Sequence, residues 1–477
     1  YSAEGGAGDF VHEFQSGPNV VMAQMGWRAH GWPSRSTPLS EVHAWLDRCD
    51  AVGASVVYDL SELAHASGGY PHSTYGIPNA SCCQDIFTLI RQEVEAVRHH
   101  NSIVGWYVAD EPDGHILPDA DRVAVVSRVS EEVRRADADA GRPTVAVLDS
   151  AVWYIGHDWQ HFLNATDEVW VDIYEDPPGS ARTWNSSLFP DSLVNHGWAI
   201  PAALDAVTQA LAPQGRSVTL VLRVTGSMED FERSPSPIEI RTATYLGWVH
   251  GSSGILFFEH ASAPDSVYGR VPSSPSLWAE CERLTVEGAQ LSPALLAGRA
   301  SEWSVTTGDD RIHAAVFLEP ARRGPLGQAA PAALVIIAAN LVKEWIVATF
   351  RVTGPGTTQL QSTKADVLFG QRTVDVNSSA AGWKISEPIE PLGVRAFRIE
   401  LQPPDAPKHA VDSRNVIRNP SFELHSSPDL PDGFQTAAAN DSDASFALES
   451  RDSVDGRHSL RIHTPSEGNG LQAIAMP

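Results

Sequence analysis

Short apolar runs alternate with helix-like segments from about residue 19 to residue 300, and this alternation constrains the fold more than any other feature of the chain. The apolar runs, which we predict to be strands, lie at 19–27, 54–60, 103–110, 144–150, 168–175, 218–224 and 254–260. Apolar residues recur at the helical period in the segments 40–53, 85–100, 121–138, 200–212 and 237–251. Such alternation predicts a parallel sheet with crossover helices. The number of units favours a (β/α)8 TIM barrel over a doubly wound sheet.

The alternation contains seven strand candidates, one fewer than a complete (β/α)8 barrel needs. A further apolar run at 9–14 lies too close to residue 19 to leave room for a crossover helix. We therefore expect a barrel that lacks its first strand in this chain, or one with an irregular strand.

The pattern changes after residue 300. Runs rich in β-formers at 312–319, 332–340, 345–352, 365–370, 372–376 and 394–401 are separated by Gly, Pro and polar turns, which is typical of an antiparallel β-sandwich. A Pro-rich linker at 402–410 precedes further β-rich runs at 415–424 and 456–465. We divide the chain into a barrel at 1–300, a sandwich accessory domain at 301–403, and a linker with a partial β module at 404–477.

Charge and hydropathy exclude two kinds of partner. The chain carries 34 Lys and Arg against 59 Asp and Glu, a formal net charge of -25, and such a surface repels nucleic acid and anionic membranes. No stretch approaches the roughly 18 to 20 consecutive apolar residues that a membrane span needs. We therefore expect no nucleic-acid partner and no membrane span.

Several features favour an extracellular or cell-surface glycoprotein. Five Asn-X-Ser/Thr sequons occur, at Asn79, Asn164, Asn185, Asn377 and Asn440. The four cysteines lack zinc spacing and are compatible with one or two disulfides in an oxidising compartment. The last β module is too short for a complete sandwich, so we expect partner segments or subunits from a larger extracellular assembly.

Acidic residues follow directly after two predicted strands, where the active site of a parallel barrel lies. Glu111 follows the run 103–110 and precedes Pro112, and Glu259 comes next to the end of the run 254–260. Strand alternation places Tyr107, Ala109 and Glu111 on one face, toward the barrel interior. Two carboxylates that face one cleft suit glycoside cleavage, because one protonates the leaving oxygen while the other attacks the sugar or activates water.

Polar and aromatic residues near the strand ends are candidates for sugar binding, because flat indole rings stack on sugar faces and carboxylates accept hydrogen bonds from hydroxyls. These candidates are Asp110, Asp172, Tyr174, Trp27, Trp106 and His260.

Three segments resemble one family. The segment HHNSIVGWYVADEPDG at 99–114 resembles the fourth-strand segment of (β/α)8 glycoside hydrolases of clan A, in which Gly-Trp-Tyr leads to Asn-Glu-Pro or Asp-Glu-Pro. The segment DEVWVDIYEDPP at 167–178 resembles that clan's Asp-X-Tyr-Pro strand, and RTATYLGWVHGSSGILFFEH at 241–260 resembles its last helix and strand. The similarity covers about residues 19–300, while NPSFEL at 419–424 is similar to the opening of sugar-binding jelly-roll modules.

The resemblance implies that Glu111 is the acid/base, and it leaves the nucleophile open. In that clan the nucleophile ends strand seven. If the first strand is missing here, strand seven is the run 218–224, and only Glu229 follows in the loop. If all eight strands start within this chain, Glu259 could lie at the end of strand seven, the position of the nucleophile.

The sequence therefore predicts a secreted glycoside hydrolase that cleaves O-glycosidic bonds of a poly- or oligosaccharide with two carboxylates, in a retaining mechanism. We expect neither a metal nor an organic cofactor, because the two carboxylates supply the proton and covalent chemistry. The alternative is a catalytically inactive hydrolase-like glycoprotein with a structural, adhesive or carbohydrate-binding role.

Overall fold

The computed structural model forms two compact units, Tyr1–Gln402 and Pro403–Pro477. The residues that it describes are 20–23, 39–61, 84–112, 119–138, 140–149, 159–173, 198–224, 234–258, 274–323, 329–355, 360, 362–379, 382–402, 434–437, 445–449, 459–463 and 472–475.

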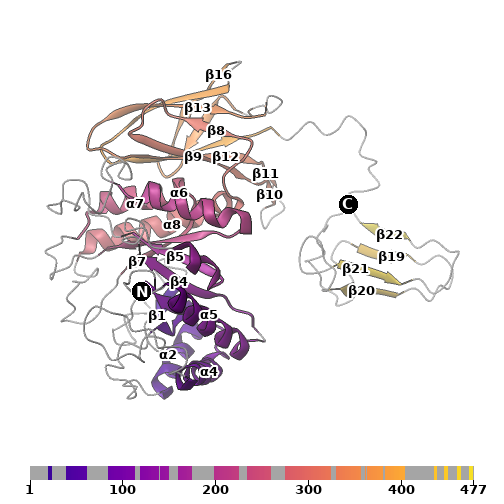
Figure 1. Ribbon diagram of the computed structural model, residues 1–477. Coiled ribbons are helices and arrows are strands. Elements are labelled where there is room, and N and C mark those ends of the chain that lie inside the picture. Colours follow the sequence, from indigo (N-terminus) through magenta and orange to yellow (C-terminus); the bar gives the residue numbers. More distant parts are fainter. Residues whose placement is uncertain are drawn as a thin grey trace. The chain divides into compact units, whose positions relative to one another are not determined.

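The first unit contains a parallel sheet whose seven strands follow one another in chain order (Figure 1). These strands are β1 (Val20–Ala23), β2 (Ser55–Asp59), β3 (Ile103–Asp110), β4 (Thr144–Asp149), β5 (Glu168–Asp172), β6 (Val218–Arg223) and β7 (Ser252–Phe258). Each coincides with a run that the sequence predicted, and the parallel pairing is confirmed. Within the described residues β1 and β7 form the two edges, so the structure shows a half-barrel sheet rather than a closed ring of eight strands.

Helices follow the strands, as expected for crossover connections. They are α2 (Leu39–Val52), α4 (Gln84–Val97), α5 (Asp119–Ala136), α6 (Ile200–Leu211), α7 (Pro237–Val249) and α8 (Pro275–Ala297), together with the short 3₁₀ helices η3 (Trp159–Asn164) and η5 (Ala212–Gln214). All but α8 and the 3₁₀ helices match segments with the predicted helical period. Helices α2, α4 and α5 cover the outer face of β2 and β3, where Tyr58, Trp106 and Val108 are buried among their apolar side chains.

The opposite, inner face of the sheet has its own apolar cluster. Tyr107, Val147, Trp170, Val221 and Leu256, from five different strands, pack together there. Both faces of the sheet are thus apolar, which explains why the strands read as continuous apolar runs.

The segment after α8 folds as two antiparallel sheets, as predicted. A five-stranded sheet has the order β15 (Arg372–Asp375), β14 (Lys364–Val367), β18 (Val394–Glu400), β12 (Ala333–Asn340) and β9 (Ile312–Glu319). A four-stranded sheet has the order β16 (Asn377–Ser379), β17 (Gly382–Ile389), β13 (Ile346–Thr353) and β8 (Ser304–Thr306), and a small hairpin pairs β10 (Arg322–Arg323) with β11 (Ala329–Ala330).

The five-stranded sheet is buried on both faces. One face packs on the four-stranded sheet, and the other packs on helices α6, α7 and α8. Every residue of β12 is buried for this reason, whereas β13, which has only one covered face, alternates between buried and exposed positions. The indole of Trp198 donates to the carbonyl of Leu341 at 3.0 Å, and the hydroxyl of Thr242 donates to the carbonyl of Leu392 at 2.6 Å. These bonds tie the helical layer to the sandwich.

The described residues of the second unit form four short strands, paired as two antiparallel ladders. They are β19 (Phe434–Ala437) with β22 (Gln472–Ala475), and β20 (Ser445–Glu449) with β21 (Ser459–His463).

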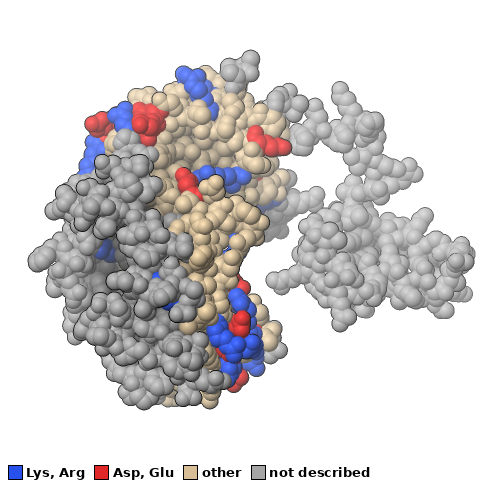
Figure 2. All heavy atoms as spheres, in the orientation of Figure 1, with Lys and Arg blue, Asp and Glu red and all other residues tan. Residues whose placement is uncertain are grey.

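Charged side chains of both signs intermix over α5, at the lower end of the coloured surface in Figure 2. The buried carboxylate of Glu132 is central to this cluster, because it pairs with Arg91 at 2.6 Å, Arg128 at 2.5 Å and Arg135 at 2.9 Å. Arg91 belongs to α4, so this network joins α4 to α5. In the part of the chain that the structure covers, no helix is both long and apolar enough to cross a membrane.

Cys49 and Cys281 are buried free thiols, and burial raises the pKa of each to about 12. Neither takes part in a disulfide, so any disulfide of the chain excludes these two. Cys82 and Cys83 lie outside the described residues.

Candidate active site

Carboxylates gather at one edge of the parallel sheet. Four neighbouring strands each end in an aspartate: β2 in Asp59, β3 in Asp110, β4 in Asp149 and β5 in Asp172. Because parallel strands run in the same direction, these ends share the edge at which parallel barrels place their active sites. Asp149 and Asp172 are direct partners in the ladder between β4 and β5.

An irregularity in β3 decides which of its residues face the interior. Between Tyr107 and Ala109 the register against β4 shifts, so that Tyr107 pairs with Val145 while Asp110 pairs with Val147. Paired residues of parallel strands lie on the same face, and both valines belong to the inner cluster. The alternation predicted Ala109 and Glu111 on the inner face with Tyr107. For Ala109 this is wrong, because the bulge turns it into the helix-side core. For Glu111 the alternation no longer gives the direction of the side chain, because Asp110 takes the inner position. Asp110 is thereby brought to the inner face.

Tyr107 links the inner cluster to the acidic edge. Its hydroxyl donates a hydrogen bond to the carboxylate of Asp110. Burial, followed by the negative charges of Asp110, Asp59 and Glu111, raises the pKa of Tyr107 well above its usual value. Tyr107 therefore stays protonated as a fixed hydrogen-bond donor to Asp110.

Glu111 has an unusual backbone conformation. It is half-buried and has a φ of 41°, in the left-handed region that residues other than glycine seldom adopt. The amide of Glu111 donates to the carbonyl of Val147 at 3.0 Å. The carbonyl of the following residue, Pro112, accepts a hydrogen bond from the side chain of the buried Arg122 at 2.7 Å. Such strain costs about 1–3 kcal/mol and tends to occur at functional sites. The surrounding hydrogen bonds hold Glu111 in this conformation.

Asp59 is a member of the site that the sequence did not single out. It is 4% exposed, and one carboxylate oxygen accepts from the amide of Ser61 at 2.7 Å and from its hydroxyl at 2.6 Å. It is the ladder partner of Tyr107. The only signal in the sequence was its position at the end of an apolar run.

The structure corrects the prediction for Trp106 and locates Asp172. Trp106 is fully buried on the helix side of the sheet, where its indole donates to Asp137 at 3.0 Å, so it is a core residue rather than a sugar-stacking residue. Asp172 lies at the acidic edge, as predicted, and is 1% exposed.

The remaining predicted site residues fall outside the described part of the chain. They are Glu259, His260, Tyr174 and Trp27, together with the sequon asparagines Asn79, Asn185 and Asn440. The last described residue of β7 is Phe258, at the same edge of the sheet. Asn164 and Asn377 are both exposed, and their glycosylation remains a prediction.

Two cavities among the described residues lie away from these acids. One of about 620 Å³ is lined by Gly105, Pro143 and Thr219, at the N-terminal ends of the strands. In a parallel barrel, that end usually contributes to stability and not to catalysis. Another, of about 520 Å³, lies where His250 and Arg299 meet the sandwich. We assign the candidate site to the acidic edge because parallel barrels place their active sites at the carboxyl ends of the strands.

No protein-family model and no curated protein matches the sequence, but solved structures of TIM-barrel glycoside hydrolases have a similar fold. The chain resembles the β-galactosidase of Bacillus circulans sp. alkalophilus with a TM-score of 0.56 and 9% identity, over 82% of this chain and 96% of that one. It resembles Amy13B of Eubacterium rectale with a TM-score of 0.50 and 9% identity, over 84% and 93% of the two chains. Against the β-galactosidase of Rahnella sp. R3 the TM-score is 0.45 at 12% identity, over 61% of this chain and 54% of that one, so this chain spans about half the length of that enzyme.

Proposed function

We propose that the protein is a glycoside hydrolase that cleaves O-glycosidic bonds of a poly- or oligosaccharide by a two-carboxylate, retaining mechanism. The observation that carries the proposal is the set of aspartates that end four neighbouring strands at the carboxyl edge of the parallel sheet, one of which, Asp110, accepts a hydrogen bond from Tyr107. The names of the proteins with a similar fold support the same class of chemistry.

In this proposal Glu111 is the general acid and base. It protonates the leaving oxygen while a second carboxylate, for which Glu259 is the candidate, attacks the anomeric carbon; Glu111 then activates the water that releases the sugar. Retention requires the two carboxyl groups to lie about 5–5.5 Å apart. The strained backbone of Glu111 supports its role, because a fixed proton donor loses little entropy at the reaction step.

Neighbouring acids would bind the sugar. The hydroxyl of Tyr107 orients Asp110, whose carboxylate we propose as an acceptor for a sugar hydroxyl. Asp172 lies on the same edge, and Tyr174, Trp27 and His260 complete the proposed binding set. We also propose that the chain acts outside the cell or at its surface, as the sequons Asn164 and Asn377, both exposed, allow.

Hydrolysis of a panel of glycosides tests the proposal. Wild-type protein is offered aryl β-galactosides, α-glucosides, β-xylosides and α-fucosides, together with soluble polysaccharides. Glu111→Gln should keep the fold and lower turnover about 10²–10⁴-fold, which is the usual contribution of general acid–base catalysis. The control is Glu168→Gln, an exposed acid at the start of β5 and hence at the opposite edge, and it should hydrolyse like the wild type.

Undiminished activity of Glu111→Gln would remove Glu111 from the mechanism. A wild-type protein that binds glycans on an array but hydrolyses none of the panel would favour the alternative, a hydrolase-like carbohydrate-binding glycoprotein.

A further inference from the structure

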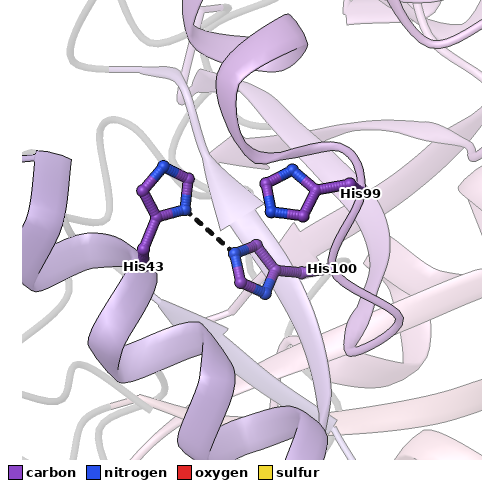
Figure 3. A group of neighbouring side chains, drawn as sticks. All are labelled: His43, His99 and His100. Carbon is purple, nitrogen blue, oxygen red and sulfur yellow. Dashed lines mark hydrogen bonds between the residues drawn. The ribbon is translucent and has the colours of Figure 1, made fainter.

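Three histidines converge on the outer side of the sheet, far from the acidic edge. His43 lies in α2, whereas His99 and His100 follow the end of α4 and precede β3. One side-chain nitrogen from each of the three lies within 4.8 Å of the others, and Figure 3 shows the rings gathered around a common point. The chain thus brings together residues that are 57 positions apart.

His100 is the anchor of this cluster. It is 3% exposed, and its Nδ1 is 2.8 Å from a carboxylate oxygen of Asp50. The other oxygen of Asp50 accepts from the amide of Ser102 at 2.6 Å, which fixes the carboxylate. A neutral His100 that donates from Nδ1 to Asp50 leaves its Nε2 as an acceptor, and this nitrogen is 3.0 Å from Nδ1 of His43.

This arrangement matches the way in which proteins orient metal-binding histidines. A ligating histidine usually donates its other ring N–H to a carboxylate or a carbonyl, which fixes the tautomer and the direction of the ring. Asp50 supplies that partner for His100. His99 is exposed, so an ion has a path from solvent and a water molecule has access to a fourth coordination position.

A second histidine pair in the same protein provides an internal comparison. His250 is 2.9 Å from Asp205 and 2.8 Å from His313, so it repeats the carboxylate–histidine–histidine chain. Among the described residues, however, no third histidine, cysteine or carboxylate joins it in a group suited to a metal. The third imidazole is therefore what distinguishes the cluster of His43, His99 and His100.

We propose that His43, His99 and His100 bind one zinc ion, with Asp50 as the residue that positions His100. Zinc–nitrogen bonds of about 2.0–2.1 Å in a tetrahedral site place ligand nitrogens about 3.3–3.4 Å apart. The present separations, from 3.0 Å to at most 4.8 Å, bracket that value, so small side-chain movements are sufficient. Three imidazoles suit zinc, copper or nickel better than magnesium or calcium.

Bound zinc would fasten α2 to the connection between α4 and β3. The histidines come before the first residue of β3, whereas Asp110 is its last residue. At about 3.3 Å per residue, the length of β3 separates the histidine cluster from Asp110 by roughly 23 Å. The ion is thus a structural one, independent of the proposed hydrolysis. The expectation that catalysis needs no metal is unaffected.

Calorimetric titration of the chelator-stripped full chain with zinc chloride tests the site. Wild-type protein should bind one zinc per chain, and added zinc should raise its melting temperature because the ion binds the folded state. Cobalt(II), used as a spectroscopic probe, should give visible absorption bands of a low-symmetry tetrahedral complex. The main variant is His99→Ala, because His99 is exposed and its removal spares the core; its zinc affinity should fall more than tenfold and its cobalt bands should be lost.

Two further variants sharpen the result. Asp50→Asn keeps an oxygen for the amide of Ser102 but weakens the orientation of His100, so zinc affinity should fall about 10–100-fold. His313→Ala, in the two-histidine comparison pair, should bind zinc with the stoichiometry and affinity of the wild type. The proposal is overturned if wild-type protein binds no stoichiometric zinc, or if His99→Ala binds it as tightly as the wild type.

Discussion

Replacement of Glu111 by glycine should leave the protein more stable than replacement by alanine does, because the residue is held in a conformation that suits glycine. The φ of 41° at Glu111 is imposed by hydrogen bonds on both sides of it, from its own amide to Val147 and from Arg122 to Pro112. Alanine at this position retains a Cβ and therefore the left-handed penalty, whereas glycine has none.

The magnitude follows from two opposing terms. An L-residue in the left-handed region costs about 1–2 kcal/mol. Glycine loses about 0.4–1 kcal/mol relative to alanine, because its unfolded chain is more flexible. The difference leaves Glu111→Gly more stable than Glu111→Ala by about 0.8 kcal/mol. With an unfolding entropy of roughly 2.1 cal/mol/K per residue, a unit of the size of Tyr1–Gln402 should melt about 1 °C higher.

Differential scanning calorimetry at one scan rate measures this difference between the two variants. Both variants lack the carboxylate, so both should lose activity on the natural oligosaccharide by the same factor, about 10²–10⁴-fold. A glycine variant that melts at or below the temperature of the alanine variant would refute the strain at this position.

Two other predictions concern the core and the pH dependence of stability. Trp106→Ala should lower the free energy of unfolding by about 3–5 kcal/mol, because the side chain is fully buried. Trp106→Phe should leave KM unchanged. A higher KM with unaltered stability would instead place Trp106 in the sugar site. Burial raises the pKa of Asp167, but hydrogen bonds from Arg134 and Thr144 outweigh it and lower the pKa below 3.8. A lowered folded-state pKa stabilises the fold above the unfolded-state value, and this stability is lost as the pH falls through the folded-state pKa. Acid unfolding of Asp167→Asn, followed by tryptophan fluorescence, should therefore depend less steeply on pH below about 4 than that of the wild type, and equal slopes would contradict the assignment.

The parallel strands were predictable because burial on both faces makes each one a continuous apolar run. Helix α8 was not, because its stripe of Leu277, Leu284 and Leu291 is interrupted by buried acids. Glu280 and Glu287 on the same helix are buried against Arg241 of α7 at 2.5 and 2.8 Å, and a partner on another helix cannot be seen in a local pattern.

The candidate site was predictable only as far as the strand ends. The position of the carboxylates at one edge follows from parallel pairing, which the periodicity predicted. The face on which each side chain lies does not follow, because the bulge between Tyr107 and Ala109 breaks the two-residue repeat. Trp106 was misassigned because an indole near a strand end serves equally well as a core residue.

The histidine cluster depends on contacts that no local pattern contains. His43 and the pair His99 and His100 belong to different helical units, and the packing of α2 beside α4 brings them together. The sequence offered no metal-ligand spacing there, since such spacing is recognisable only when the ligands lie close along the chain.

The most direct test of the central claim is how the loss of activity in Glu111→Gln depends on the leaving group. A proton donor matters most when the leaving oxygen is strongly basic, and hardly at all for a dinitrophenolate. For the sugar that the panel identifies, kcat/KM of the variant should fall about 10²–10⁴-fold on the methyl glycoside or the natural oligosaccharide, and by only a few-fold on the dinitrophenyl glycoside. An equal loss on both substrates would show that Glu111 does not deliver the proton, and would contradict the account.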